Sequence, residues 1–257
     1  MKILFVGNSQ MYTYDLPRML KLLLESTRRD SPPIETGQAL GGGASLKSHW
    51  EAGTKPGSAP ALIAASHWDY VVLQENCCAS EPEFTKYAEM FDELIRKHGA
   101  QTILFAAAHA TQYYAASFQY PDSFEKLNGM QVAFGKKWGI AVAAAGYAWM
   151  KHFGPNPSES KILDLYAQDR GHPGKKGTYI YACLLYAWMT GRNPAGLTSD
   201  FKEIADGIVI PTSEAAKLQQ VAWEQYLENY KNALRDDRSS SSVSNSRIGI
   251  PPDDSND

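Results

Sequence analysis

Four short apolar segments recur along the chain, and a fifth, weaker candidate over residues 34–40 ends at a run of three glycines. Each of the five predicts a strand of a sheet. They cover residues 2–6, 34–40, 69–73, 102–106 and 140–144. Apolar runs of this length, bounded by glycine or polar residues, are typical of strands buried on both faces. The pattern therefore predicts strands in the interior of the molecule.

Helical periodicity fills the stretches between these strands. Leu16, Met19, Leu20 and Leu23 recur at the spacing of a buried helix face. Further helices are predicted over residues 60–66, 84–97, 118–138, 178–189 and 215–234. Strands that alternate with helices predict an α/β fold class: a three-layer α/β/α sandwich around a five-stranded parallel sheet, similar to flavodoxin in layout. Ligands bind such sheets outside the carboxyl ends of the strands.

The composition changes near the end of the chain. Residues 236–257 read DDRSSSSVSNSRIGIPPDDSND, which is polar, rich in serine and free of aromatic residues. Such a segment cannot bury enough apolar surface to offset the entropy of ordering, so we expect a disordered tail. The 257 residues are otherwise compatible with one domain, over 1–235.

Bulk composition excludes several classes of function. The hydrophobic share of 44% and the charged share of 21% are typical of a globular protein. A net charge of -3 gives no basic face for nucleic acid. Three cysteines argue against a disulfide framework, and the histidines lack metal-ligand spacing, so neither metal nor cofactor is expected.

The apolar runs also bear on location. None is long enough to span a membrane, and the run after Met1 is too short for a secretory signal. As the sequence stands, a cytoplasmic protein with no membrane partner is expected; removal of a leader would instead imply a secreted or periplasmic one. The oligomeric state is not predicted.

Two short motifs have the residue types of nucleophilic catalysis. Gly7-Asn8-Ser9 places a serine on a turn between the first strand and a helix, where backbone N–H groups converge on an anion. In Asp169-Arg170-Gly171-His172-Pro173, a compact turn can bring the Asp169 carboxylate to the imidazole of His172. Each motif alone also fits an ordinary role, as a helix cap or a solvated loop.

Together these motifs resemble the SGNH (GDSL-like) hydrolase superfamily over nearly the whole chain. Gly7-Asn8-Ser9 matches the first block, GDS, and Asp169 with His172 matches the last block, D-x-x-H. The resemblance is closest to a branch that has GNS in place of GDS, an LQE segment after strand three and an HP-x-x-x-G-x-Y run, here residues 172–179. It implies catalysis by Ser9, His172 and Asp169.

The resemblance also implies an oxyanion hole. The N–H groups of Ser9 and Gly43 and the side-chain amide of Asn76 match the family's donors. Two departures stand out: Asn8 replaces the usual aspartate, and the third block, GxND, has become Gln74-Glu75-Asn76-Cys77. Because the first glycine of that block is lost, Gln74 is the alternative amide donor.

Other residues near the predicted strand ends have less specific patterns. His109, after strand four, is a candidate for substrate binding, with a surface position as the equal alternative. Trp149, after strand five, is a candidate wall of the acyl or sugar pocket, although core packing is the stronger expectation for a tryptophan between Ala148 and Met150. Simple packing beside the oxyanion loop is expected for Cys77 and Cys78.

The resemblance implies hydrolysis of an ester through an acyl-enzyme. A small acyl group, such as acetyl on a carbohydrate, is the expected substrate type. The alternative is an inactive SGNH-like protein that binds a glycan or small acid in the same cleft, which the altered third block favours. A flavodoxin-like nucleotide binder is a second alternative.

Overall fold

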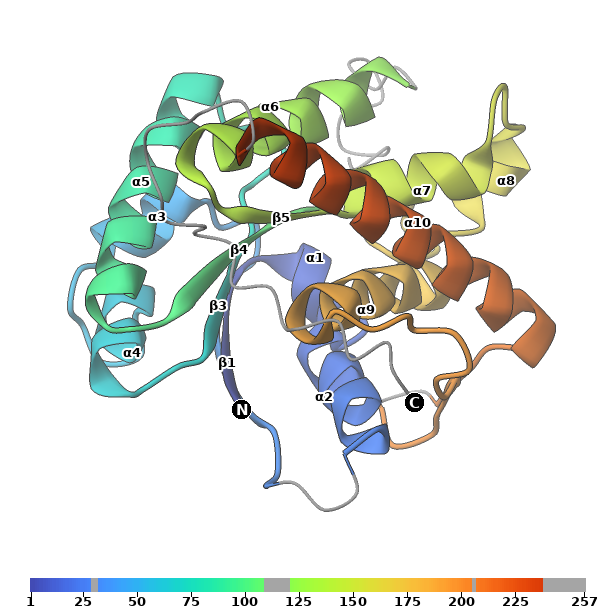
Figure 1. Cartoon of the computed structure of the whole chain (residues 1–257), viewed down its shortest axis with the longest axis horizontal. Coiled ribbons are helices and arrows are strands. Elements are labelled where there is room, and N and C mark those ends of the chain that lie inside the picture. Colours follow the sequence, from blue (N-terminus) through green and yellow to red (C-terminus); the bar gives the residue numbers. More distant parts are fainter. Residues whose placement is uncertain (29–31, 109–120, 205–206, 238–257) are drawn as a thin grey trace.

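A parallel sheet lies at the centre of the computed structural model, which describes residues 1–28, 32–108, 121–204 and 207–237, with side chains to residue 230 (Figure 1). The order of its five strands is β2-β1-β3-β4-β5. Their bounds are β1 (Lys2–Gly7), β2 (Glu35–Leu40), β3 (Tyr70–Leu73), β4 (Gln101–Ala106) and β5 (Ala141–Ala144). Every pairing between them is parallel, as the alternating pattern predicts.

Helices cover both faces of this sheet, so the three-layer prediction is confirmed. On one face, α2 (Leu16–Ser26), α7 (Ala145–Phe153), α9 (Lys175–Thr190) and α10 (Thr212–Asp237) pack against alternate strand residues such as Phe5. The other face is covered by α3 (Leu46–Glu51), α4 (Ala59–Ala65), α5 (Glu81–Lys97) and α6 (Asp122–Trp138). Figure 1 shows the two sets on opposite sides of the sheet.

The strand order also fixes where chemistry is expected. The chain passes from β1 to one edge strand, β2, and returns to the other side of β1 to form β3. The carboxyl ends of β1 and its neighbours therefore border a topological switch point, the usual binding crevice of such sheets. Ser9 begins α1 (Ser9–Tyr12) directly after β1, at this crevice.

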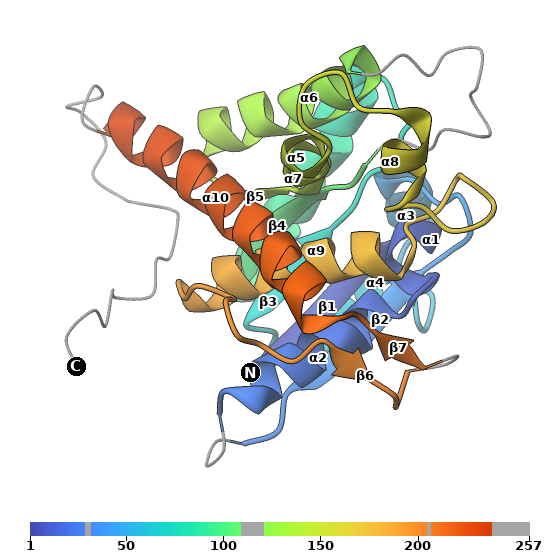
Figure 2. The same cartoon turned by 90° about the vertical axis from the view of Figure 1, so that its right-hand side faces the viewer.

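Several short elements lie outside the predicted set. They are α1, α3 and α7, the helix α8 (Glu159–Leu163), and a two-stranded antiparallel sheet of β6 (Asp200–Phe201) and β7 (Ile208–Val209). In Figure 2, α10 runs across α7 and α9, and the helix continues to Asp237. The predicted tail thus starts inside a helix at residues 236–237, and its remainder lies outside the described residues.

The helices of the described part of the chain include none with the length and apolar character needed to cross a bilayer.

Candidate active site

The side chain of Gln74 supports the turn that carries Ser9 through a hydrogen bond to its backbone. The Gln74 Oε1 atom accepts the Asn8 N–H at 2.9 Å. A Cβ atom on Gly7 would lie only 2.7 Å from that oxygen and 2.9 Å from the Gln74 Cβ atom, closer than real Cβ atoms approach. Glycine at position 7 is therefore required for this close contact. The turn leaves Ser9 at the start of α1, where the Asn8 Oδ1 atom caps the Gln10 N–H at 3.0 Å.

Ser9, His172 and Asp169 are hydrogen-bonded in series. The Ser9 Oγ and His172 Nε2 atoms are 2.8 Å apart, although 163 positions separate the two residues in sequence. The His172 Nδ1 atom lies 2.5 Å from the Asp169 Oδ2 atom. With Nδ1–H donated to the carboxylate, Nε2 is the nitrogen that accepts a proton. The three residues predicted as a triad thus meet at one edge of the sheet.

The Asp169 carboxylate is fixed by more than the imidazole. Its Oδ1 atom accepts the N–H groups of Gly171 at 2.9 Å and of His172 at 3.0 Å. Partial burial raises the pKa of Asp169, but the hydrogen bonds from the His172 ring and from these two N–H groups outweigh it, so the net pKa is lowered. Asp169 therefore stays ionised and orients the ring at neutral pH.

Backbone contacts hold the loop that carries His172. The Ala167 N–H donates to the His172 carbonyl at 2.9 Å, and the side chain of Gln10 donates to the Gly171 carbonyl at 2.9 Å. Arg170, with φ of 58°, adopts the left-handed conformation that lets this loop turn back. Because Gln10 follows Ser9 directly, its side chain links the Ser9 turn to the His172 loop.

The HP-x-x-x-G-x-Y run has a packing reason in this structure. A Cβ atom on Gly177 would lie 2.3 Å from the Trp149 ring and 2.4 Å from the Leu165 carbonyl oxygen. Only glycine allows α9 to approach so closely. Trp149 is fully buried and stacks on Tyr181, with ring centroids 5.2 Å apart. The candidate role of Trp149 as a pocket wall is therefore corrected to core packing, because no part of its ring is left for a substrate.

The loop after β2 and the turn after β3 contact each other, and the loop after β2 also contacts the turn that carries Ser9. Gly43 has φ of 65°. The Asn76 side chain donates through Nδ2 to the Gly43 carbonyl at 2.8 Å and accepts the Cys78 N–H at 2.9 Å. A primary amide has two N–H donors, so one remains for a further acceptor. Gly43 and Asn76, predicted from different strand ends, are thus brought into direct contact.

The amide of Gln74 is engaged inside the protein. Gln74 is 1% exposed, its Nε2 atom donates to the Glu75 carbonyl, and its Oε1 atom supports Asn8. An amide in this position acts as a structural link to the turn that carries Ser9.

Asn8 uses the donor that an aspartate lacks. It is 3% exposed, and its Nδ2 atom donates to the Ala44 carbonyl at 3.0 Å, which joins the Ser9 turn to the loop after β2. The departure from the GDS motif therefore has a structural reason: a carboxylate at this position would face a carbonyl oxygen.

We expect the variant N8D to be less stable, by about 1–3 kcal/mol in the free energy of unfolding. The hydrogen bond to the Ala44 carbonyl would be lost, and a carboxylate oxygen would face that carbonyl oxygen in a buried position. Burial would raise the pKa of the new carboxyl, so its proton would be bound more tightly in the folded state and the stability loss would grow as the pH rises. Urea unfolding at pH 5 and pH 8 measures this; equal losses at both pH values would contradict the assigned contact.

Three supporting residues could not be recognised from sequence. Gln10 and Glu75 act through contacts between distant segments, and His49 donates from Nε2 to the Gly7 carbonyl at 2.8 Å. Burial lowers the pKa of His49 and outweighs the bond to Gly7, which raises it. The net pKa is therefore lowered, and the ring stays neutral at pH 7. Glu75 lies in the LQE segment, but that segment does not indicate its contacts, and no local signal distinguishes Gln10 or His49 from ordinary helix positions.

The remaining candidates have simpler outcomes. His109 lies outside the described residues. Cys77 and Cys78 are the central residues of a turn closed by the bond from the Ala79 N–H to the Asn76 carbonyl at 3.2 Å. Within the described ranges, no group of His, Cys, Asp or Glu side chains has the geometry of a metal site.

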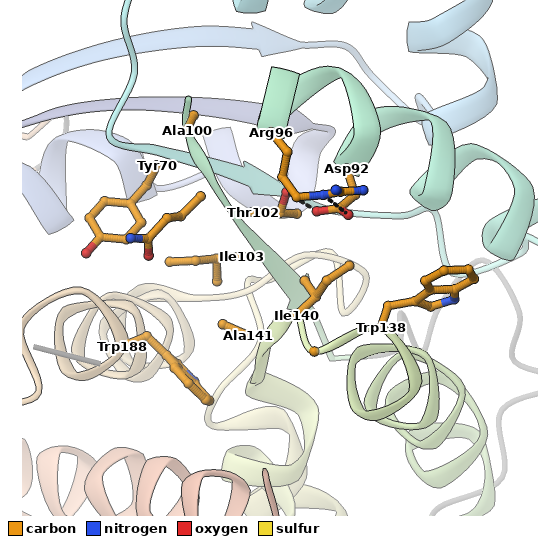
Figure 3. Close-up of a pocket in the computed structure, with 12 residues that line it drawn as sticks. Tyr70, Asp92, Arg96, Ala100, Thr102, Ile103, Trp138, Ile140, Ala141 and Trp188 are labelled. Atoms are coloured by element: carbon orange, nitrogen blue, oxygen red, sulfur yellow. Dashed lines mark hydrogen bonds and ion pairs between the residues drawn. The ribbon is translucent and has the colours of Figure 1, made fainter. Parts of the chain in front are cut away.

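A small cavity of about 80 Å³ opens near the amino ends of β3 and β4, on the side of the sheet away from the triad (Figure 3). Tyr70 and Gln101, which line it, begin β3 and β4, whereas Ser9 follows the end of β1. Its buried carboxylate, Asp92, accepts from Arg96 Nε and Thr102 Oγ1, each at 2.8 Å. Both Asp92 oxygens are satisfied, so this cluster links α5 to β4 and is remote from the triad.

Comparisons with known proteins were made on the sequence and on the fold. No family model matches the sequence. No curated protein matches it either. Solved structures do match the fold, at low sequence identity.

One similar structure, from Slackia heliotrinireducens, is provisionally described as an SGNH hydrolase; it is 24% identical with a TM-score of 0.61, and the match covers 74% of this chain and 98% of that one. A lipase/acylhydrolase from Enterococcus faecalis is 16% identical with a TM-score of 0.57, over 74% and 96%. The acetylxylan esterase Axe2 from Geobacillus stearothermophilus is 14% identical with a TM-score of 0.54, over 70% and 90%. The chain therefore has the fold of the SGNH hydrolases.

Proposed function

We propose that this protein is a serine esterase that hydrolyses a small ester through an acyl-enzyme, with its catalytic unit within residues 1–235. The observation that supports this most directly is the 2.8 Å contact between Ser9 Oγ and His172 Nε2, with Asp169 behind the ring. A nucleophile, a base and a group that orients the base, each within hydrogen-bond reach of the next, make up the machinery of acyl transfer.

In the first step, Ser9 Oγ attacks the ester carbonyl carbon and its proton passes to His172 Nε2. The tetrahedral intermediate collapses, the bond to the alcohol oxygen breaks, and His172 returns the proton to that oxygen. Water then attacks the acyl-enzyme with His172 again as base, which releases the acid and regenerates Ser9. Asp169 remains ionised throughout and stabilises the imidazolium.

The negative oxygen of each intermediate is assigned to the N–H groups of Ser9 and Gly43 and the side-chain amide of Asn76. Asn76 is favoured over Gln74 because the residue is partly exposed and its amide has an N–H to spare, whereas the Gln74 amide is buried and already bonded to Asn8 and Glu75. Donors fixed in advance stabilise the developing charge without reorganisation.

We expect N76A to lower kcat about 100-fold or more with little change in KM, because the missing donor acts on the transition state and not on the ground state. Steady-state kinetics on a short-acyl ester measures this. The matched control is N193A, since Asn193 is an exposed asparagine whose side chain caps the Ala195 N–H at 2.9 Å on another loop. Equal kcat values for the two variants would contradict the assignment of Asn76.

The substrate class rests on kinship of fold. Similar structures include acetyl xylan esterases, which favours an acetyl or other short acyl group on a carbohydrate. The binding-protein alternative requires no proton path from Ser9, so the intact hydrogen-bonded series of three residues favours the enzyme.

A panel of esters tests this proposal. Acetylated xylo-oligosaccharides and 4-nitrophenyl acetate, butyrate and octanoate are incubated with the wild type and with S9A, and released acid is measured. We expect turnover that falls as the acyl chain lengthens. Acid release equal to that of S9A on every ester, together with saturable binding of a xylo-oligosaccharide, would instead support the binding protein.

A further inference from the structure

Glu75 is a buried acid that accepts two hydrogen bonds from different segments of the chain. It lies two residues after the end of β3 and is 2% exposed. Its Oε1 atom accepts the Leu46 N–H at 3.1 Å and the Asn76 N–H at 2.6 Å. One oxygen atom is thereby shared between the end of the loop after β2 and the turn after β3.

These are the two segments that carry the assigned oxyanion donors. Gly43 lies in the loop of residues 41–45, and that loop ends where α3 begins at Leu46. Asn76 bonds the Gly43 carbonyl from its side chain. The Glu75 oxygen forms a second link between the same two segments, through backbone N–H groups on both sides. The separation of the Gly43 and Asn76 donors therefore depends on the reach of one carboxyl group.

We propose that Glu75 is a positioning residue of the oxyanion hole, which holds the loop of Gly43 and the amide of Asn76 at the spacing that the tetrahedral intermediate requires. This inference rests on the proposed function. Glu75 touches no substrate and transfers no proton; it acts through the two N–H groups that it binds.

A buried carboxyl group at position 75 is costly to the stability of the fold. Burial raises the pKa of Glu75 to about 7, against the lowering effect of its bonds to Asn76 and Leu46. Its second oxygen, Oε2, has no hydrogen-bond partner in the described structure. What the site uses is an acceptor oxygen at a fixed reach, which the carboxylate, the neutral acid and an amide all provide.

Three substitutions separate positioning from bulk packing. E75Q keeps the side-chain length and the acceptor oxygen. E75D keeps the chemistry but withdraws the oxygen by about 1.5 Å, one C–C bond. E75M keeps the approximate volume and removes both oxygens. D92L is the matched control, because Asp92 is also a buried carboxyl with two side-chain partners but lies at the opposite edge of the sheet.

The readouts are kcat and KM on a short-acyl ester, and Ki for a short-chain trifluoromethyl ketone, which forms a tetrahedral oxyanion adduct with a serine nucleophile. We expect E75Q to stay within about threefold of the wild type, and E75D and E75M to lose roughly 10-fold to 100-fold in kcat with KM nearly unchanged. The Ki should rise by the same factor as kcat/KM falls, because both report oxyanion stabilisation. D92L should lose stability and keep kcat per folded molecule.

Folded E75D and E75M with wild-type kcat and Ki would overturn the inference, and so would an E75Q loss as large as that of E75M. If E75M does not fold, E75D decides, since its acceptor is present but displaced. A wild type that neither hydrolyses esters nor binds the ketone would overturn the proposed function, and the role of Glu75 with it. An active wild type with insensitive Glu75 variants would overturn the role of Glu75 alone.

Discussion

Replacing Ser9 by alanine is expected to lower kcat for a short-acyl ester by at least about 10⁴-fold while the protein stays folded. The loss is this large because the hydroxyl both attacks the substrate and becomes the leaving group of the second step. The Ser9 hydroxyl bonds His172 and supports no other element in the described part of the chain. S9A should therefore unfold at nearly the wild-type temperature.

Steady-state kinetics and thermal unfolding of S9A measure the two expectations. S160A is the matched control, because Ser160 is an exposed serine whose hydroxyl bonds that of Ser158 at 3.0 Å. An S9A variant that keeps more than a few per cent of wild-type kcat would show that another group attacks the ester.

The second large effect is expected for D169N, which we predict lowers kcat by roughly 10³–10⁴-fold with KM little changed. The substituted amide side chain would have the same size as that of Asp169, and its oxygen could still accept from the Gly171 and His172 N–H groups. Its NH₂ group would then point at His172 Nδ1, which forces the ring proton onto Nε2. In that tautomer Nε2 cannot accept the Ser9 proton.

Kinetics of D169N, together with the ¹⁵N NMR spectrum of the imidazole, measures both the loss and its cause. We expect the Nε2–H tautomer in D169N and the Nδ1–H tautomer in the wild type. Wild-type turnover in D169N, or an unchanged tautomer, would contradict the assigned role of Asp169.

The sheet could be predicted because four of its strands are short apolar runs between polar turns; β2, with the sequence ETGQAL, has a weaker pattern. Each observed strand differs from the predicted one by a single residue at one of its two ends. The short elements could not be predicted: α1 has four residues and β6 has two, too few for a period to emerge. Helix α7 follows β5 without an intervening turn, so no polar boundary separates the two patterns.

The residues of the site also differ in whether a local sequence pattern could predict them. Ser9, and Asp169 with His172, lie in compact local motifs, so sequence could indicate them. The residues that place these motifs act across the chain: Gln10 bonds a residue 161 positions away, and Glu75 bonds one 29 positions away. Such contacts exist only once the sheet has formed, and nothing in the local sequence specifies them.

The central claim is that the Ser9 hydroxyl is an activated nucleophile, and a fluorophosphonate probe tests it most directly. After incubation at neutral pH, intact-mass and peptide mass spectrometry locate the adduct. We predict one adduct per chain, on Ser9, that is absent from S9A and forms far more slowly in H172A. A chain that remains unlabelled, or that is labelled at another residue with Ser9 intact, would contradict the account.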